Sequence, residues 1–140
     1  MFARIVLAYD GSAGAQRALN AAAGLAAEMG SEVVVVSVED HLPHYGATVG
    51  EVDEERAFEQ RIAQRCLTEA SARLDEAGVK TRTEIRAGHA AQEIVRAATD
   101  HAATLIVVGA SGHSGVWGRF LGSTTEKVSR HAPCAVLIAR

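Results

Sequence analysis

Residues 104–112 read TLIVVGASG, and residues 122–126 read GSTTE. The apolar run at 104–108 predicts a buried strand, and the polar residues from Ser123 onward predict the start of a helix. The glycines at 109, 112 and 122 therefore lie where a strand gives way to a helix, beside backbone N–H groups and the positive end of the helix dipole. Because glycine has no Cβ, an anion can approach its backbone closely. We expect this segment to hold a phosphate group.

Apolar runs of strand length alternate with helical periodicity along the whole chain. We expect strands at 3–9, 32–38, 79–86 and 104–108, and a last strand that begins at Cys134 and ends at Ala139. The runs near Val6, Val34 and Ile106 are continuously apolar, which is typical of parallel strands covered on both faces.

Helices are expected between these strands. The first carries apolar residues on one face and stops at Gly30, with Leu19, Ala22, Leu25, Ala26 and Met29 on that face. The second stops at Gly78 and is expected to bury Phe58, Ile62, Cys66, Ala70, Leu74 and Ala77. Both glycines suit the left-handed position after a helix. The third helix is expected at 90–101 and the last at 123–131, where Ser123 and Glu126 have the spacing of a capping box.

This order of elements predicts an α/β fold with one doubly wound, Rossmann-like sheet of five parallel strands. Right-handed crossovers restrict how the strands can be arranged, and the usual five-strand solution places the first and fourth strands side by side, in the order 3-2-1-4-5, with helices on both faces. The length of 140 residues fits one domain over 1–140. Ligands in such sheets bind beyond the carboxyl ends of the strands, where the order reverses.

A second glycine-containing turn should lie at the same edge. Residues 9–14 read YDGSAG after the first strand, so Asp10 is expected beside the glycines that follow the fourth strand. Two segments separated by nearly the whole chain are thereby predicted to form one crevice. Glycine motifs alone are a weak signal, and their convergence carries the hypothesis of a bound nucleotide phosphate.

The composition excludes several other classes of protein. A net charge of -3 argues against a nucleic-acid partner. The apolar opening is too short for a signal peptide, and no apolar stretch is long enough to cross a bilayer, so the cytoplasm is the expected compartment. Cys66 and Cys134 are far apart and lie in apolar patterns, which predicts buried free thiols. No set of ligands for a tightly held metal is found.

These residues resemble the universal stress protein family in its ATP-binding branch, over the whole chain. The family's nucleotide motif is Gly, two residues, Gly, nine residues, Gly, and then Ser or Thr; Gly109, Gly112, Gly122 and Ser123 match it without a gap. Residues 5–12, IVLAYDGS, resemble the family's first strand and its ligand-facing acid. Residues 133–138, PCAVLI, resemble its last strand.

The resemblance implies that the crevice binds ATP, with Mg²⁺ carried by the phosphates, and that last strands pair across the two-fold axis of a homodimer. It places base and ribose toward the ends of the first two strands and phosphates on the glycine loop. The implied binding residues are Ala8, Tyr9, Asp10, Val38 through its main chain, Gly109, Ser111, Gly112, Gly122, Ser123 and Thr124. Many relatives have a larger polar or basic residue at the position of Ser111.

Several of these residues have a purely structural alternative. Asp10 either binds the ribose hydroxyls or caps the turn after its strand. The Ser123 hydroxyl either contacts phosphate or serves the capping box, although a hydroxyl can donate to one group while it accepts from another. Thr124 is a weaker candidate, and Ser111 and His113 could equally lie on the loop surface.

The sequence favours a nucleotide-dependent sensor or regulator in stress response over a catalyst. The phosphate loop has no lysine, the chain's lysines being Lys80 and Lys127, and His89 and Glu93 have no evident partner as a base. Slow ATP hydrolysis or self-phosphorylation is an alternative that the resemblance suggests. A nucleotide-free dimeric interaction module is a third, which the intact glycine loop argues against.

Overall fold

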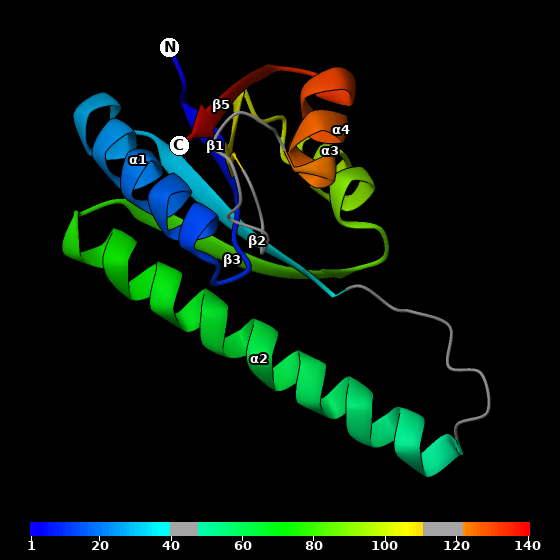
Figure 1. The fold of residues 1–140 in the computed structure, drawn as a ribbon. Helices are drawn as coiled ribbons and strands as arrows, with labels where there is room; N and C mark the ends of the chain where they lie inside the picture. Colours follow the sequence, from blue (N-terminus) through cyan, green and yellow to red (C-terminus); the bar gives the residue numbers. More distant parts are fainter. Residues whose placement is uncertain (40–47, 111–121) are drawn as a thin grey trace.

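The computed structural model describes residues 1–39, 48–110 and 122–140. Its sheet has five parallel strands in the order β3-β2-β1-β4-β5, as predicted (Figure 1). The strands are β1 (Arg4–Ala8), β2 (Glu32–Glu39), β3 (Lys80–Ala87), β4 (Leu105–Gly109) and β5 (Ala135–Ala139). Each predicted strand boundary is correct to within one residue, and in β1, β2 and β4 the apolar runs coincide with the buried parts of the strands.

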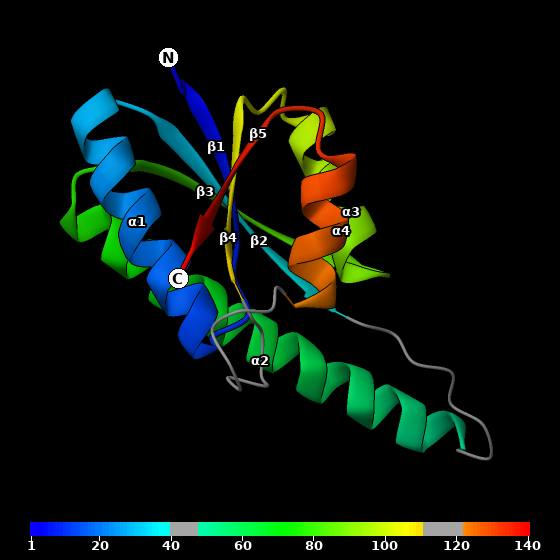
Figure 2. The same ribbon diagram turned by 45° about the horizontal axis from the view of Figure 1, so that its top comes forward.

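Helices cover both faces of the sheet (Figures 1 and 2). They are α1 (Ala13–Met29), α2 (Val49–Glu76), α3 (Ala90–Asp100) and α4 (Ser123–His131). Alternate strand residues separate the core into two clusters: Leu7 and Val35 pack with α1 and α2, whereas Val6 and Val34 pack with α3 and α4. In the apolar runs of β1, β2 and β4, successive residues are therefore buried on opposite faces of the sheet, which explains why these runs are continuously apolar.

Helix ends agree with the glycine signals but not with the predicted capping box. Gly30 and Gly78 have φ of 65° and 72°, the left-handed conformation expected after a helix. At α4, however, Gly122 is the N-cap, with φ of -61° and ψ of 156°, and Ser123 is already helical. The prediction that Ser123 caps α4 is wrong, because a capping hydroxyl must lie one residue before the first helical residue.

The helix α2 is longer than the sheet that it covers. Its capping box, formed by Thr48 and Glu51, lies far before the buried residues. At about 1.5 Å per residue its 28 residues span about 42 Å, so its first half extends past the strands (Figure 2). Phe58 and Ile62 are consequently 57% and 47% exposed, against the prediction that they are buried. Met29, the last residue of α1, is 39% exposed.

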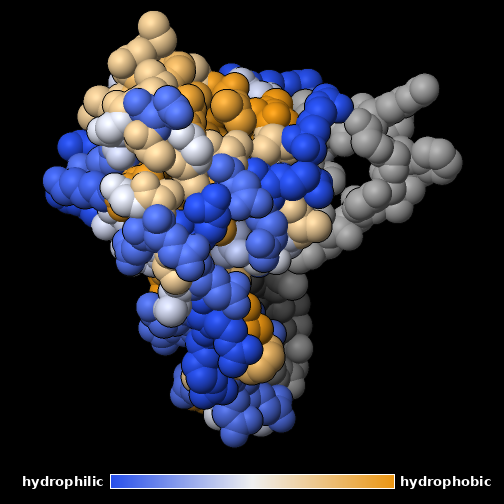
Figure 3. All heavy atoms as spheres, turned by 90° about the vertical axis from the view of Figure 1, so that its left-hand side faces the viewer, coloured by the Kyte–Doolittle hydropathy of each residue, from blue (hydrophilic) through white to orange (hydrophobic). Residues whose placement is uncertain are grey.

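The surface of the molecule is mainly polar over α2. In Figure 3 the lower part of the surface, which α2 forms, is mostly hydrophilic with an apolar spot.

Over the ranges that the structure describes, none of the helices combines the length and the apolar character that crossing a membrane requires.

The backbones of β4 and α1 touch at the carboxyl edge of the sheet. A Cβ placed on Gly109 would lie 2.5 Å from the carbonyl carbon of Gly14, closer than real Cβ contacts allow. Gly14 is itself buried in the first turn of α1. A residue with a side chain at position 109 would therefore force α1 away from β4.

We expect Gly109→Ala to lower the free energy of unfolding by about 1–3 kcal/mol, the usual cost of overpacking. Gly24→Ala is the matched control: it lies within α1, and a Cβ there has no neighbour within 4 Å. It should raise the free energy of unfolding by about 0.5–1 kcal/mol, because alanine favours the helix. Urea unfolding followed by circular dichroism measures both. Equal stability of Gly109→Ala and the parent protein would contradict the close approach.

Candidate functional site

The turn after β1 is organised by its own polar side chains. Tyr9 extends the ladder of hydrogen bonds, because its N–H donates to the Val36 carbonyl at 3.0 Å. The Ser12 N–H donates to Asp10 Oδ1 at 2.9 Å, and Ser12 Oγ accepts from the Ala15 N–H at 3.2 Å as the N-cap of α1. Asp10 thus has the turn-capping contact that was one of its two predicted roles. Its side chain is also exposed at the edge of the sheet, as ribose binding requires.

Beneath this turn lies a buried pair of titratable side chains. Tyr9 is 3% exposed and packs in the α1 and α2 core together with Cys66. Burial, and then the charge of Glu69, raises the pKa of both groups, so Cys66 is held as a thiol rather than a thiolate. The Cys66 sulfur would lie 3.1 Å from a Cβ on Gly11, whose φ is 80°. Tyr9 can therefore face a ligand only through its backbone.

The end of β4 meets the start of α1 at this edge of the sheet. The contact of Gly109 with Gly14 brings these two segments together. Ala8, at the end of β1, follows Leu7, which pairs with Val107 of β4. Val38 lies at the end of β2, opposite Arg86 of β3, and the parallel strands place it at the same edge. Ser111 and Gly112 lie outside the described residues.

The start of α4 is tied to the end of β4 by two hydrogen bonds. The Gly122 N–H donates to the Ala110 carbonyl at 2.8 Å, and the buried Thr125 hydroxyl donates to the Gly109 carbonyl at 2.6 Å. The Gly122 amide is therefore already hydrogen-bonded within the protein. The role of Thr125 was not predicted from the sequence. Its hydroxyl bonds to a carbonyl 16 residues away, and that contact is seen only in the structure.

The amides of the first turn of α4 remain as candidate anion donors. The first N–H groups of a helix have no partner within the helix, and within the described ranges no side chain caps α4. Ser123 is exposed and Thr124 is half-buried. Because Gly122 takes the capping position, neither hydroxyl is needed to cap the helix. The competition predicted for the Ser123 hydroxyl is thereby absent.

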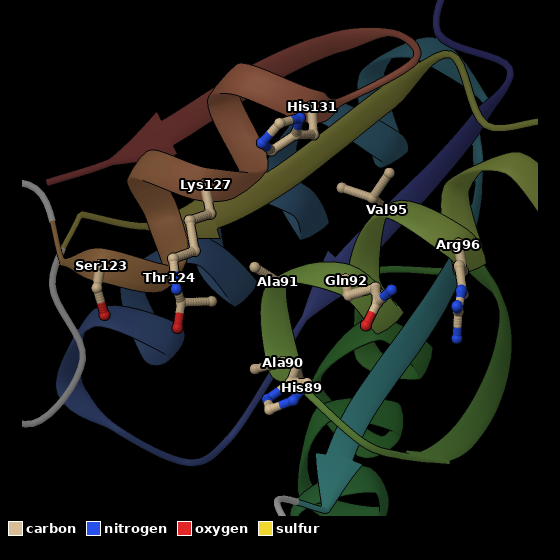
Figure 4. A pocket seen from close by; sticks show the side chains of 10 residues that line it. All are labelled: His89, Ala90, Ala91, Gln92, Val95, Arg96, Ser123, Thr124, Lys127 and His131. Atoms are coloured by element: carbon tan, nitrogen blue, oxygen red, sulfur yellow. The ribbon is translucent and has the colours of Figure 1, made fainter.

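A cavity of about 560 Å³ opens between α3 and α4, beside these residues (Figure 4). Its α4 side is formed by Ser123, Thr124, Lys127 and His131, and its α3 side includes His89, Gln92 and Arg96. No carboxylate is among the described residues that line it. The volume is in the usual range for small-molecule sites, about 300–1,000 Å³. His89 and Lys127, which the sequence did not place in the binding site, both line this cavity.

An ion-pair cluster holds the α3 side of this cavity in position. Arg86 of β3 donates through Nε to Glu93 Oε1 at 3.2 Å and through a terminal nitrogen to Asp100 at 2.8 Å. Burial alone would lower the pKa of Arg86, but its bonds to Asp100 and Glu93 raise it. Arg96 donates to the second oxygen of Glu93 at 2.7 Å. The 10% exposed Glu93 side chain thus neutralises Arg96 at the cavity wall.

Comparison with known proteins gives a consistent result. The model of the universal stress protein family matches residues 1–140. The Thermus aquaticus protein named "universal stress protein in QAH/OAS sulfhydrylase 3′ region" is 36% identical over 140 residues, which is 100% of each chain. The structure of the universal stress protein UspA from Lactobacillus plantarum superposes with a TM-score of 0.89 at 27% identity, over 99% of this chain and 98% of that one. A crystal structure of a universal stress protein in complex with cAMP gives a TM-score of 0.77 at 25% identity, over 99% and 97% of the two chains.

We expect Thr125→Val to lower the free energy of unfolding by about 1–3 kcal/mol, because the shape is kept while the buried Gly109 carbonyl loses its donor. Thr125→Ser, which keeps the hydroxyl, should cost about 0.8 kcal/mol for one lost methyl group. Thermal and urea unfolding of the two variants make the comparison. A Val variant as stable as the Ser variant would show that the hydroxyl does not hold α4 to β4.

Proposed function

Because this chain belongs to the universal stress protein family, we propose that it binds an adenine nucleotide at the carboxyl edge of its sheet and acts as a nucleotide-dependent sensor or regulator in stress response. The observation that carries the proposal is that the start of α1 and the start of α4, where the cavity lies, both meet the end of β4 at Gly109. The complex of a related structure with cAMP supports an adenine nucleotide as the ligand class.

Our specific candidate is ATP, with Mg²⁺ bound mainly through its phosphates. Asp10 and the ends of β1 and β2 would hold ribose and base, with Val38 contributing its main chain. The amides at Ser123 and Thr124, together with their hydroxyls, would hold the phosphates, because helix starts favour anions. Gly109, Ser111, Gly112 and Gly122 belong to the same proposed loop.

The described cavity favours a sensor over a catalyst. Hydrolysis needs a residue that positions or deprotonates the attacking water. The described lining residues include imidazoles but no carboxylate to orient them. We therefore propose that the bound nucleotide changes the protein's interactions rather than being turned over rapidly.

The first test is the content of the purified protein. We expect denaturation to release an adenine nucleotide, or the emptied protein to bind ATP in calorimetry, with negligible release of phosphate from ATP over the same period. Mass analysis of the released ligand identifies it. A protein that neither retains nor binds any adenine nucleotide would refute the proposal.

Gly122→Val tests the phosphate seat. The backbone of Gly122 is extended, so valine can adopt its conformation and the fold should be kept. The side chain would obstruct the phosphate, and we expect ATP affinity to fall by about tenfold or more, as when one charge-assisted hydrogen bond is lost. Gly50→Val, at an exposed position with no neighbour within 4 Å of its Cβ, is the control and should leave affinity unchanged. Unchanged affinity in the Gly122 variant would place the phosphates elsewhere.

We further propose a homodimer that pairs through β5, the strand from Ala135 that was expected to begin at Cys134. In the described sheet β5 is an edge strand that pairs with β4, and Val136, Leu137 and Ile138 are only partly buried. An apolar edge strand favours pairing with another strand. The Ala139 carbonyl accepts from Ala110 on the β4 side, so the N–H and carbonyl of Ile138 point to the open edge.

Ile138→Pro should convert the dimer to a monomer, because proline removes the outward N–H while edge positions tolerate it. Sedimentation velocity measures the change in mass, and circular dichroism verifies that the fold is kept. A parent protein that is monomeric at high concentration, or a folded variant that still dimerises, would rule out pairing through β5.

A further inference from the structure

The helix α4, which follows the glycine-rich segment, carries a lysine that lines the cavity. Lys127 lies one helical turn after Ser123 and Thr124 on α4, and all three line the same cavity. Side chains of a helix tilt toward its N-terminus, and Figure 4 shows the Lys127 side chain directed back toward Thr124. The ammonium group is therefore carried toward the proposed phosphate seat from the helix side.

The charge of Lys127 is not balanced within the described part of the chain. Arg96, the other permanent cation of the cavity, is paired with Glu93 at 2.7 Å. The neighbouring Glu126 pairs with Arg130 at 2.8 Å. No ion pair of Lys127 occurs among the described residues, and no described carboxylate lines the cavity. An anion in the cavity would thus meet a cation that the protein has not already neutralised.

The wall opposite Lys127 leaves space for such an anion. Ala90 and Ala91 occupy the first turn of α3 on the facing side, where larger side chains would fill the cavity. His89, the N-cap of α3, adds an imidazole without any side-chain capping bond. The cavity is thus bordered by two helix starts, one lysine without an ion pair among the described residues, and small alanine side chains on the opposite side. A single helix N-terminus would provide neither the lysine nor the space.

We infer that Lys127 binds the phosphate tail of the nucleotide and makes the site select phosphorylated nucleosides over neutral ones. This inference rests on the proposed function, since it concerns the same ligand. Lys127 acts here as a binding residue that determines specificity through charge. A neutral nucleoside would keep the contacts of base and ribose but would gain nothing from the ammonium group.

The experiment compares Lys127→Gln with the parent protein in calorimetric titrations with ATP and with adenosine, at one fixed Mg²⁺ concentration. We expect ATP affinity to fall by about tenfold or more and adenosine affinity to change by less than about twofold. Lys127→Arg, which keeps the positive charge, should restore most of the ATP affinity. Lys80→Gln is the matched control, because Lys80 is the other lysine of the chain and does not line the cavity. It lies at the start of β3, where its Nζ is 3.7 Å from Oε2 of Glu32.

The outcomes separate the inference from the proposed function. If the parent protein binds neither ligand, both are refuted. If it binds ATP and Lys127→Gln loses no affinity, or loses it equally for ATP and adenosine, the role of Lys127 is refuted and the proposed function stands. Lys127 is exposed, so the variant should fold, and an unchanged thermal unfolding curve verifies this.

Discussion

The close approach of two backbones at Gly109 is the constraint on which the candidate site depends. On one face of the sheet, Gly14 of α1 occupies the space where a side chain of residue 109 would lie. On the other side, the Thr125 hydroxyl of α4 binds the Gly109 carbonyl. One residue at the end of β4 thus fixes the starts of two helices from different layers. Two helix starts held at one strand end produce a concentrated source of backbone N–H groups.

This arrangement gives the glycine at position 109 a packing explanation. The sequence suggested that the missing Cβ admits a phosphate, but in the structure the backbone of Gly14 of α1 occupies that space. A buried packing requirement would preserve this glycine even without a ligand. Evidence for nucleotide binding therefore comes from the cavity and its charges rather than from the glycine alone.

The charges around the cavity are divided between structure and binding. Glu93 and Arg86 form a mostly buried network that anchors α3 to β3, and this network also takes up Arg96. Such buried pairs act mainly by fixing geometry, because desolvation offsets much of their attraction. Lys127 is outside the network, on the facing helix, where its charge is available to a ligand. Arg96 and Lys127 thus lie on opposite sides of the cavity, and of the two only Arg96 has an ion pair among the described residues.

The sequence by itself determined the elements of the fold and their order. Continuous apolar runs such as 33–36 marked parallel strands, and Gly30 and Gly78 marked helix ends. Right-handed crossovers restricted the arrangement of the sheet, and the usual five-strand order is the one observed. Only the tertiary structure decided that Gly122 rather than Ser123 caps α4, that Phe58 lies beyond the sheet, and that Lys127 faces His89 across a cavity. The physical reason is range: periodicity and turn conformation depend on neighbours in sequence, whereas caps, helix overhang and cavities depend on where separate elements pack against one another.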